Sequence, residues 1–529
     1  MEAVSQLDQD ASIALATIRE WRNSFSRVNR IPIEIISLVP THLSSQKDRF
    51  RAASVCRRWR GAFLKHGTLW SRLFLRRGEE YLSTLLKRAK GSALDVIFDC
   101  WFWTANTITL ISNHARQIRS IEFILCNWQD ILAFESNSGR LPLLRTLKIV
   151  SLKIDASIFP AAISPPVPIF RDSIDLKQFI FHCRCWELQL LSHFVYPNLT
   201  TFELSSDPGG ECSASHLLDF LKASPLLRMV EMKIFGTIIL ASIPEGTVVV
   251  LPDVETFSLH MVDGPSTQIY DLASHISCPR ARYTSLTHEV DEDDMMVGLG
   301  LFPTPDSWNT IVCQYMANPI EEVTLEINDS TDEDLECFLA FRSSDATTVR
   351  LGFNVDETGE VGLLMDRAEM GWEIFSQALT TIRDHPLLPH VKRLHIKYKA
   401  TAPDTYETRM ADKVRELFGS LEPLDELTIC GCDLRIFLRH FLRGSWFNGL
   451  ETPLVFLQAK KLTILHPSVG YNAVGCARAI LELAKLQHAL AIPFERVTIS
   501  TGWFPIRMKG ELERWVGAVD YSEEKEEAV

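Results

Sequence analysis

The sequence predicts two kinds of structure: a small helical module at the N-terminus, followed by an irregular solenoid built on a curved parallel sheet. Three observations support this prediction. The chain has 529 residues, more than one compact core holds. Its first part is basic and has the patterns of short helices, whereas the rest is acidic. Beyond Ala93, one short β-rich motif returns along the chain.

Composition and charge limit the function. The chain is 46% hydrophobic and 23% charged, as expected of a soluble folded protein. Its net charge of −13 argues against a general role on nucleic acid or anionic lipid, so neither is an expected partner. From Ala11 to Lys90, however, about seventeen Lys and Arg stand against about five Asp and Glu. This asymmetry indicates two surfaces with different partners.

The N-terminus and the cysteines bear on location. The first residues, MEAVSQLDQD, are acidic and lack the basic start and apolar run of a signal peptide. No stretch approaches eighteen uninterrupted apolar residues, so no membrane segment is expected. The 12 cysteines follow no regular framework. This favours free thiols in a reducing compartment, the cytoplasm, the nucleus or both.

Residues 1–27 are predicted to form an N-terminal amphipathic helix. Large apolar residues, among them Ile18 and Trp21, recur there at intervals of roughly three to four. Residues 76–92 are expected to form a helical connector. Residues 516–529 are expected to form an acidic tail, and its charged end, YSEEKEEAV (521–529), is expected to lack fixed structure.

Residues 28–75 are predicted to form a module of short helices. Pro32 suits the first turn of a helix, where its missing N–H leaves no bond unmade. A longer helix is expected over 46–65, with a cluster of arginines on its polar side. Phe50 falls on that polar side, so it is expected to be exposed unless something covers it. The module holds more apolar residues than it can bury, which indicates an interaction surface. The predicted apolar side of the longer helix consists of Ala52, Val55, Cys56, Trp59, Ala62 and Phe63.

A motif of apolar, two residues, apolar, one residue, apolar recurs over residues 93–515. Successive copies are often roughly 23 to 35 residues apart, which is the spacing of leucine-rich repeats. Such a unit cannot bury its apolar face alone, so the units are expected to stack into a curved parallel sheet. The copies are IRSIEF (118–123), LRTLKI (144–149), LTTFEL (199–204), LRMVEM (227–232), VETFSL (254–259), IEEVTL (320–325), VKRLHI (391–396), LDELTI (424–429), the partial KKLTI (460–464) and FERVTI (494–499).

The repeats are degenerate. Only Cys126, Asn328 and Cys432 supply the small polar residue that the repeat uses at its turn. The alternative is an ordinary α/β domain in which the motif arises by chance. Ten copies of the motif argue against this alternative. The predicted fold class is therefore α + α/β, a small helical module followed by an irregular leucine-rich-repeat solenoid.

Outward-pointing strand residues are candidates for binding a protein client. In a strand, alternate residues share a face, so a residue between two inward positions points outward. The alternative for each position is a merely solvated side chain. Because the repeat region is acidic, a basic client is weakly favoured. The candidates are Lys148, Glu203, Glu231, Thr324, Glu326, His395, Lys397 and Thr428.

No catalytic, cofactor or metal site is predicted. Cys183-x-Cys185 and Cys430-x-Cys432 lack a second pair at the spacing of a structural zinc site. The acidic run 291–294 lacks the spacing of a calcium loop. The motifs of nucleophilic and zinc-dependent hydrolases are missing. We therefore expect a protein that is not an enzyme and needs no cofactor.

Several separated residues of the helical module resemble one family. Their order and spacing resemble an F-box, although Ile31 stands where leucine is usual. The general layout resembles the F-box-like families of mushroom-forming fungi. The matching elements are Ile31-Pro32, Glu34, Ile35-Ile36, Phe50, VCRRWR (55–60) and Leu69-Trp70.

The resemblance implies docking on the Skp-family adaptor and cullin scaffold of an SCF-type ubiquitin ligase, with the repeats holding an unknown protein client. It implies that Trp59, Cys56 and Phe63 form the core, and that Arg57 and Arg58 steer encounter with an acidic adaptor. A repeat scaffold outside ubiquitylation is the second reading, and an enzyme or nucleic-acid binder is the third. The residues implied in adaptor contact or its support are Ile31, Pro32, Ile35, Ile36, Leu43, Phe50, Val55 and Trp70.

Overall fold

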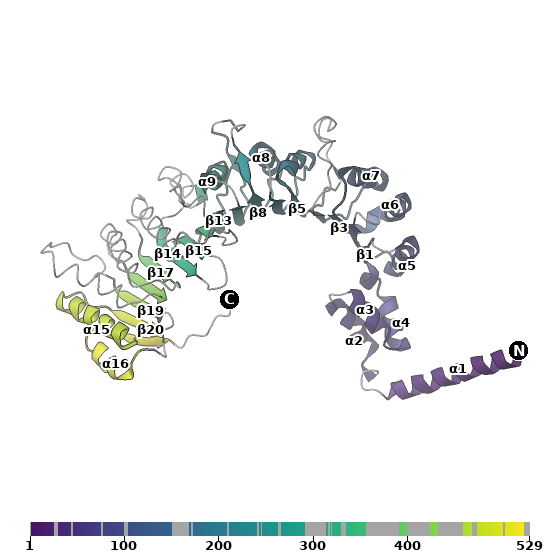
Figure 1. The fold of residues 1–529 in the computed structure, drawn as a ribbon, viewed down its shortest axis with the longest axis horizontal. Helices are drawn as coiled ribbons and strands as arrows, with labels where there is room; N and C mark the ends of the chain where they lie inside the picture. The colour runs from purple at the N-terminus through teal and green to yellow at the C-terminus, as the bar shows by residue number, and fades with distance from the viewer. Residues whose placement is uncertain are drawn as a thin grey trace, which may run out of the picture. The chain divides into compact units, whose positions relative to one another are not determined.

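The chain divides into two compact units, Met1–His182 and Cys183–Val529. The structure is a computed structural model, and its ribbon is drawn in Figure 1. It describes residues 2–25, 30–43, 46–75, 78–99, 104–150, 169–170, 173–208, 211–240, 243–244, 246–262, 266–290, 314–315, 318, 320–329, 335–355, 391–398, 424–431, 459–467, 473–500 and 503–522. Cys432, the acidic run 291–294 and the end of the tail lie outside these ranges.

The first unit begins with the predicted helices. They are α1 (Glu2–Ser24), α2 (Ile33–Leu38), the 3-10 turn η2 (Val39–His42), α3 (Gln46–Ala53), α4 (Arg57–Lys65), the 3-10 turn η3 (Gly67–Trp70) and α5 (Glu79–Ala89). The α1 and α5 helices occupy the segments predicted for the N-terminal helix and the connector. The N-terminal helical region predicted from the sequence is confirmed.

The helix predicted over 46–65 is two helices, α3 and α4. The Ser54 hydroxyl donates to the Phe50 carbonyl (2.8 Å), and the Ser54 and Val55 amides bond three residues back, which tightens the turn. Cys56 is then extended (φ −160°, ψ 172°) where α4 begins. The break turns Val55 away from the predicted apolar side, so this side chain is 56% exposed.

Strands follow the helices earlier than predicted. The segment around Leu73, within the range 28–75 that was predicted to form short helices, is strand β1, which pairs in parallel with β2. Each of the strands β1 to β5 pairs in parallel with the next. The bounds are β1 (Arg72–Phe74), β2 (Leu94–Asp99), α6 (Ala105–Ser112), the 3-10 turn η5 (Ala115–Gln117), β3 (Ile118–Ile124), α7 (Trp128–Ser138), β4 (Thr146–Val150) and β5 (Gln178–Arg184).

The core of the first unit lies between these strands and the helices on one side of them. In Figure 1, α5, α6 and α7 lie along the same side of β1 and β3. Phe98 of β2 contacts Phe123 of β3 and Phe134 of α7, with ring centroids 5.0 and 4.8 Å away. All three side chains are fully buried. Close aromatic packing of this kind joins neighbouring motifs across the layer.

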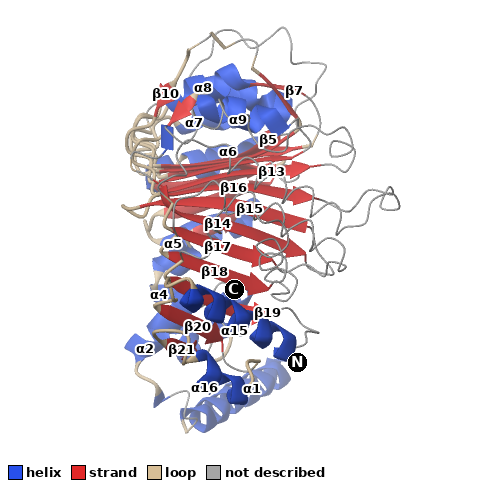
Figure 2. Ribbon diagram, turned by 90° about the vertical axis from the view of Figure 1, so that its left-hand side faces the viewer, coloured by secondary structure: helices blue, strands red, loops and turns tan. Residues whose placement is uncertain are grey.

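The second unit is a mostly parallel sheet with helices. Its main sheet has the order β6, β8, β11, β13, β16, β15, β14, β17, β18, β19, β20, β21, and only β15 among these strands is antiparallel to its neighbours. Figure 2 shows strands β13 to β18 of this sheet side by side. A mixed α/β fold with a mostly parallel sheet, as predicted, is confirmed.

The bounds of the second unit's elements are as follows. The helical elements are η6 (Cys185–His193), α8 (Ala214–Lys222), α9 (Ser266–Ser274), α15 (Ala473–Ala489) and α16 (Ile506–Leu512). The strands are β6 (Thr201–Asp207), β7 (Glu211–Ser213), β8 (Met229–Phe235), β9 (Thr237–Ile239), β10 (Val249–Val250), β11 (Thr256–Val262), β12 (Ile276–Ser277), β13 (Tyr283–Val290), β14 (Ile320–Asp329), β15 (Leu335–Ser343), β16 (Thr348–Val355), β17 (Arg393–Tyr398), β18 (Glu426–Gly431), β19 (Lys461–Pro467), β20 (Arg496–Ser500) and β21 (Val519–Ser522).

The recurring motif coincides with the parallel strands. In its copy LRTLKI, for example, Leu144, Leu147 and Ile149 are fully buried. Sequence analysis missed LKQFIF (176–181) on β5, which has Phe at both strand positions, and ARYTSL (281–286) on β13, which begins with Ala. The expected unstructured tail is wrong at its start, because β21 pairs in parallel with β20.

One backbone hydrogen bond repeats where the motifs begin. The residue after the first apolar position donates its N–H to the carbonyl of its counterpart in the neighbouring motif. The N···O distance is 2.8 Å from Arg145 to Arg119, and 2.8 Å from Glu255 to Arg228. From Asp425 to Lys392 it is 2.7 Å. This bond holds adjacent motifs in the same register before the strand pairing begins.

The order of the strands departs from the order of the sequence at β14. The β14–β15–β16 segment is an antiparallel meander, so β16 rather than β14 pairs with β13. On its outward face the Phe338 ring lies against Gly352, and the Arg350 guanidinium sits 3.5 Å from the ring centroid. A Cβ at Gly352 would lie 2.5 Å from Phe338 Cδ1. Glycine is therefore required beneath this ring.

We expect Gly352→Ala to destabilise the meander by about 1–3 kcal/mol, because the Phe338 ring is held between the sheet and Arg350. Denaturant unfolding of the full chain measures this change. Phe338→Ala in the same chain removes the clash, so the two substitutions together should cost less than the sum of their separate effects. Strict additivity would contradict the proposed contact.

Candidate functional site

The α2 helix presents three apolar side chains to solvent, Ile33, Ile35 and Leu38. Pro32 precedes it (φ −52°, ψ 145°), and its carbonyl accepts from the amides of Ile35 (3.1 Å) and Ile36 (3.0 Å). Ile36 is fully buried, which fixes the helix rotation. Ile35 (50% exposed) and Leu38 (55% exposed) stand three residues apart on the opposite side. We call Ile35 and Leu38 the α2 apolar face.

The core that supports α2 is aromatic. Trp59 and Phe63 of α4 are buried and stack with ring centroids 5.9 Å apart. The Trp70 indole N–H donates to the Phe63 carbonyl at 3.1 Å. Cys56, which was expected in the same core, is only half-buried. The module therefore has a fixed interior despite its small size.

Phe50 is covered within the chain rather than left on a polar side. Its ring lies 5.4 Å from that of Trp70 and 6.4 Å from that of Tyr81 in α5, measured between centroids. Trp70 is itself 3% exposed, and the Arg88 guanidinium lies 4.9 Å from its ring centroid. Phe50 is half-buried as a result. Phe50 and Trp70 thus join the module to α5.

Three arginines hold the module's segments together. Arg58 donates to the Ile31 carbonyl at 2.8 Å, so α4 is tied to the residue just before Pro32. Arg49 donates to the Leu43 carbonyl at 2.9 Å, and Arg60 to the Ala53 carbonyl at 3.4 Å. Arg58 therefore has a structural role, while its expected role in steering an acidic adaptor stays a prediction. Charge-assisted bonds to carbonyls are among the stronger hydrogen bonds in proteins.

The residues expected at the adaptor surface divide by exposure. The exposed ones are Pro32, Ile35 and Val55, the half-buried ones are Ile31, Leu43 and Phe50, and the buried ones are Ile36 and Trp70. The buried pair supports the surface and is not part of it. Leu38 was not among the residues expected in adaptor contact, although it lies three residues after Ile35 and therefore on the same face.

The central candidates for client binding form rows across the second unit's sheet. Thr324, His395 and Thr428 lie in register on β14, β17 and β18. The next outward pair on β14 and β17 is Glu326 and Lys397, and Lys397 Nζ lies 3.4 Å from Glu326 Oε2. Thr428 is only 5% exposed, so it contributes little to any contact surface.

The remaining candidates lie apart from this group. Lys148, in the first unit, makes an ion pair with Glu122 at 3.1 Å. Glu203 and Glu231 are directly opposite each other on β6 and β8 of the second unit. Two acidic side chains therefore lie in register at one place on the outward face.

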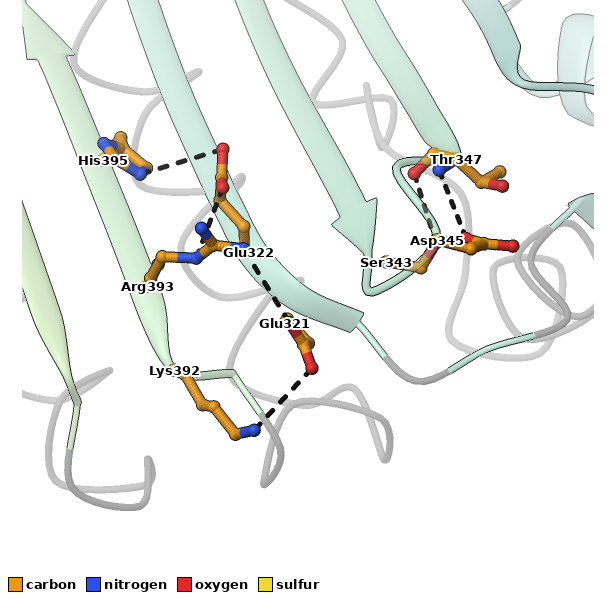
Figure 3. A network of polar contacts seen from close by, with 8 residues as sticks. All are labelled: Glu321, Glu322, Ser343, Asp345, Thr347, Lys392, Arg393 and His395. Carbon is orange, nitrogen blue, oxygen red and sulfur yellow. Dashed lines mark hydrogen bonds and ion pairs between the residues drawn. The ribbon is translucent and has the colours of Figure 1, made fainter.

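Charged pairs alternate in sign along the edge where the strands begin (Figure 3). Lys392 Nζ lies 3.7 Å from Glu321 Oε1, and Arg393 Nε lies 3.4 Å from Glu322 Oε2. On the following strands, Lys460 Nζ lies 2.6 Å from Asp425 Oδ1. The acidic strand starts are thus largely neutralised by their basic neighbours.

Two outward histidines are neutral at pH 7. Burial, with a contribution from Lys233, lowers the pKa of His260 to about 4. Its Nε2, 3.2 Å from Glu289 Oε2, therefore makes a hydrogen bond to the carboxylate as a neutral ring. Burial also lowers the pKa of His395, against the opposing effect of Glu322, whose Oε1 lies 3.8 Å away. Both rings are less than a quarter exposed.

The described ranges hold no cluster of three or more His, Cys, Asp or Glu side chains suited to a metal ion. Within those ranges, Cys183 is buried and Cys430 is half-buried. In the same part of the chain, no helix has the length and apolar character needed to cross a membrane.

Comparison with known families assigns the helical module. A family model described as F-box-like matches residues 28–76, which include α2, α3, α4 and η3. No curated protein matches the chain. The chain therefore contains an F-box-like domain, and domains of this kind typically bind Skp-family adaptors. The predicted F-box is confirmed at this level.

Acidification should destabilise the second unit through His260. The folded state holds this pKa near 4, below the unfolded value of 6.5, so stability is complete above about pH 6.5 and is lost as the pH falls toward 4. From neutral pH to pH 5 the loss is about 2 kcal/mol. Denaturant unfolding at the two pH values measures it. His260→Gln should reduce the pH dependence, and an unchanged pH dependence would contradict this assignment.

Proposed function

We propose that this chain is the substrate-recognition subunit of an SCF-type cullin–RING ubiquitin ligase. The F-box-like domain docks on the Skp-family adaptor, which links it to the cullin scaffold. The observation that carries the proposal is the α2 apolar face within the matched domain, where Ile35 and Leu38 are half or more exposed above a fixed aromatic core. Exposed apolar side chains on an ordered helix are typical of a protein-docking surface.

The strand region is the client-binding part in this proposal, and we infer that it is a leucine-rich-repeat solenoid. Two observations support this inference. The motif's apolar positions are buried in parallel strands, and the hydrogen bond from each motif start to its neighbour recurs, as between Glu255 and Arg228. Such an array offers a long polar sheet face to a folded partner or an extended segment.

The client's charge follows from the outward residues. The rows around Glu326 and Lys397 are paired within the chain, so they offer little net charge. Glu203 and Glu231, in register on β6 and β8, are the two acidic candidates that a basic client would meet together. A Lys or Arg side chain of the client is therefore the proposed contact there.

The chemistry of ubiquitin transfer belongs to the other subunits in this proposal, and the chain is not itself an enzyme. Its proposed location is the cytoplasm, the nucleus or both. A repeat scaffold that docks a protein partner without ubiquitylation is the second candidate. The ion pair between Glu322 and Arg393 favours this scaffold, because charges that are paired within the chain suit a structural array.

Ile35→Asp should abolish a stoichiometric complex with the Skp-family adaptor. The carboxylate would be desolvated in the interface, whereas the free domain should tolerate it because the position is half exposed. Size-exclusion chromatography and calorimetry measure the complex, and circular dichroism checks the fold. Ile174→Asp, at an isoleucine that is 65% exposed outside the domain, is the matched control. If the native chain forms no complex with the adaptor at low micromolar concentration, the proposal is contradicted.

Ubiquitin transfer separates the ligase subunit from the scaffold. With the remaining ligase subunits supplied, a client captured by the chain should be ubiquitylated by the native chain and not by Ile35→Asp. Glu203→Lys with Glu231→Lys should weaken capture of a basic client about tenfold or more while adaptor binding persists. Capture and adaptor binding without transfer would favour the scaffold.

A further inference from the structure

The α1 helix carries an apolar seam of its own. The apolar residues of this seam, with Phe25 directly after the last residue of the helix, follow one another at separations of four, three, four, three and four. All of them are exposed, and they are Leu7, Ala11, Ala14, Ile18, Trp21 and Phe25. The large ones are 57–70% exposed: Leu7 70%, Ile18 61%, Trp21 67% and Phe25 57%. Alternating steps of three and four are the spacing at which one helix packs along another.

The sizes along this seam are unequal. In a parallel pair of identical helices each residue meets its own copy, so Ala11 and Ala14 would form two successive layers of small side chains. In an antiparallel pair, Trp21 meets Ala11, Ile18 meets Ala14 and Phe25 meets Leu7. Large against small fills the space between the helices, as close packing requires.

The charges beside the seam agree with the antiparallel pair. In that register Asp8 lies opposite Arg22 of the second copy, and the relation occurs twice because the pair is two-fold symmetric. Leu15, 53% exposed, then lies opposite Leu15 of the second copy. The parallel register places Asp10 beside Leu15 instead.

We propose that α1 is a self-association helix that pairs antiparallel with α1 of a second copy of this chain. A helix of 23 residues spans about 35 Å, or roughly three heptads, so a dissociation constant on the order of micromolar is expected. An anionic membrane surface is a poorer occupant, because α1 has four acidic residues against two basic ones. The proposal stands independently of the ligase assignment.

Matched isoleucines test the seam. Ile18→Asp places a carboxylate inside it, whereas Ile13→Asp makes the same change at a position 59% exposed but off the seam. Sedimentation of the full chain between about 1 and 100 μM should show a dimer for the native chain and Ile13→Asp. Ile18→Asp should weaken it at least about 100-fold. Adaptor binding should be equal in all three chains, which separates this test from that of the proposed function.

A charge exchange tests the direction. Asp8→Arg and Arg22→Asp alone should each weaken the dimer about threefold to tenfold, because like charges then oppose each other. The two substitutions in one chain restore opposite signs and should recover the native affinity. Gln9→Arg, on the outer side of the helix, should have no such effect. A monomeric native chain, equal loss from both isoleucine variants, or failure of the double exchange to recover affinity would overturn the proposal.

Discussion

The hydrogen bond between the start of one motif and the start of the next is the constraint on which the parallel strands of each unit depend. The backbone N–H of Arg145 donates to the carbonyl of Arg119 in the first unit, and that of Glu255 to the carbonyl of Arg228 in the second. Neighbouring strands therefore begin in register. A shift by one residue would turn every apolar side chain of the strand to the wrong face. The bond uses only backbone atoms, so the side chain at that position is free to vary.

That freedom explains the charge pattern at the strand starts. Since the position faces solvent, it carries Glu321, Lys392, Asp425 and Lys460 in turn, and neighbouring signs neutralise one another. Exposed pairs of this kind contribute little stability each. Their consequence is electrostatic, because they remove net charge from the edge where the strands begin.

The helical module keeps an apolar face exposed although it has only a small core. Ile36 is fully buried and sets the rotation of α2, and the Arg58 bond to Ile31 fixes where that helix begins. Phe50 and Trp70 extend the support to α5. Because the support is ordered, Ile35 and Leu38 remain accessible without collapsing onto the chain. Docking then requires little rearrangement of this surface.

The sequence by itself determined the helical module, the F-box resemblance and the parallel strands, because periodic apolar spacing reflects burial directly. It also identified residues that point outward, since alternation in a strand is local. Only the tertiary structure decided that Phe50 is covered and that β16 rather than β14 follows β13. These outcomes depend on contacts between segments distant in the chain, and a local pattern carries no information about them.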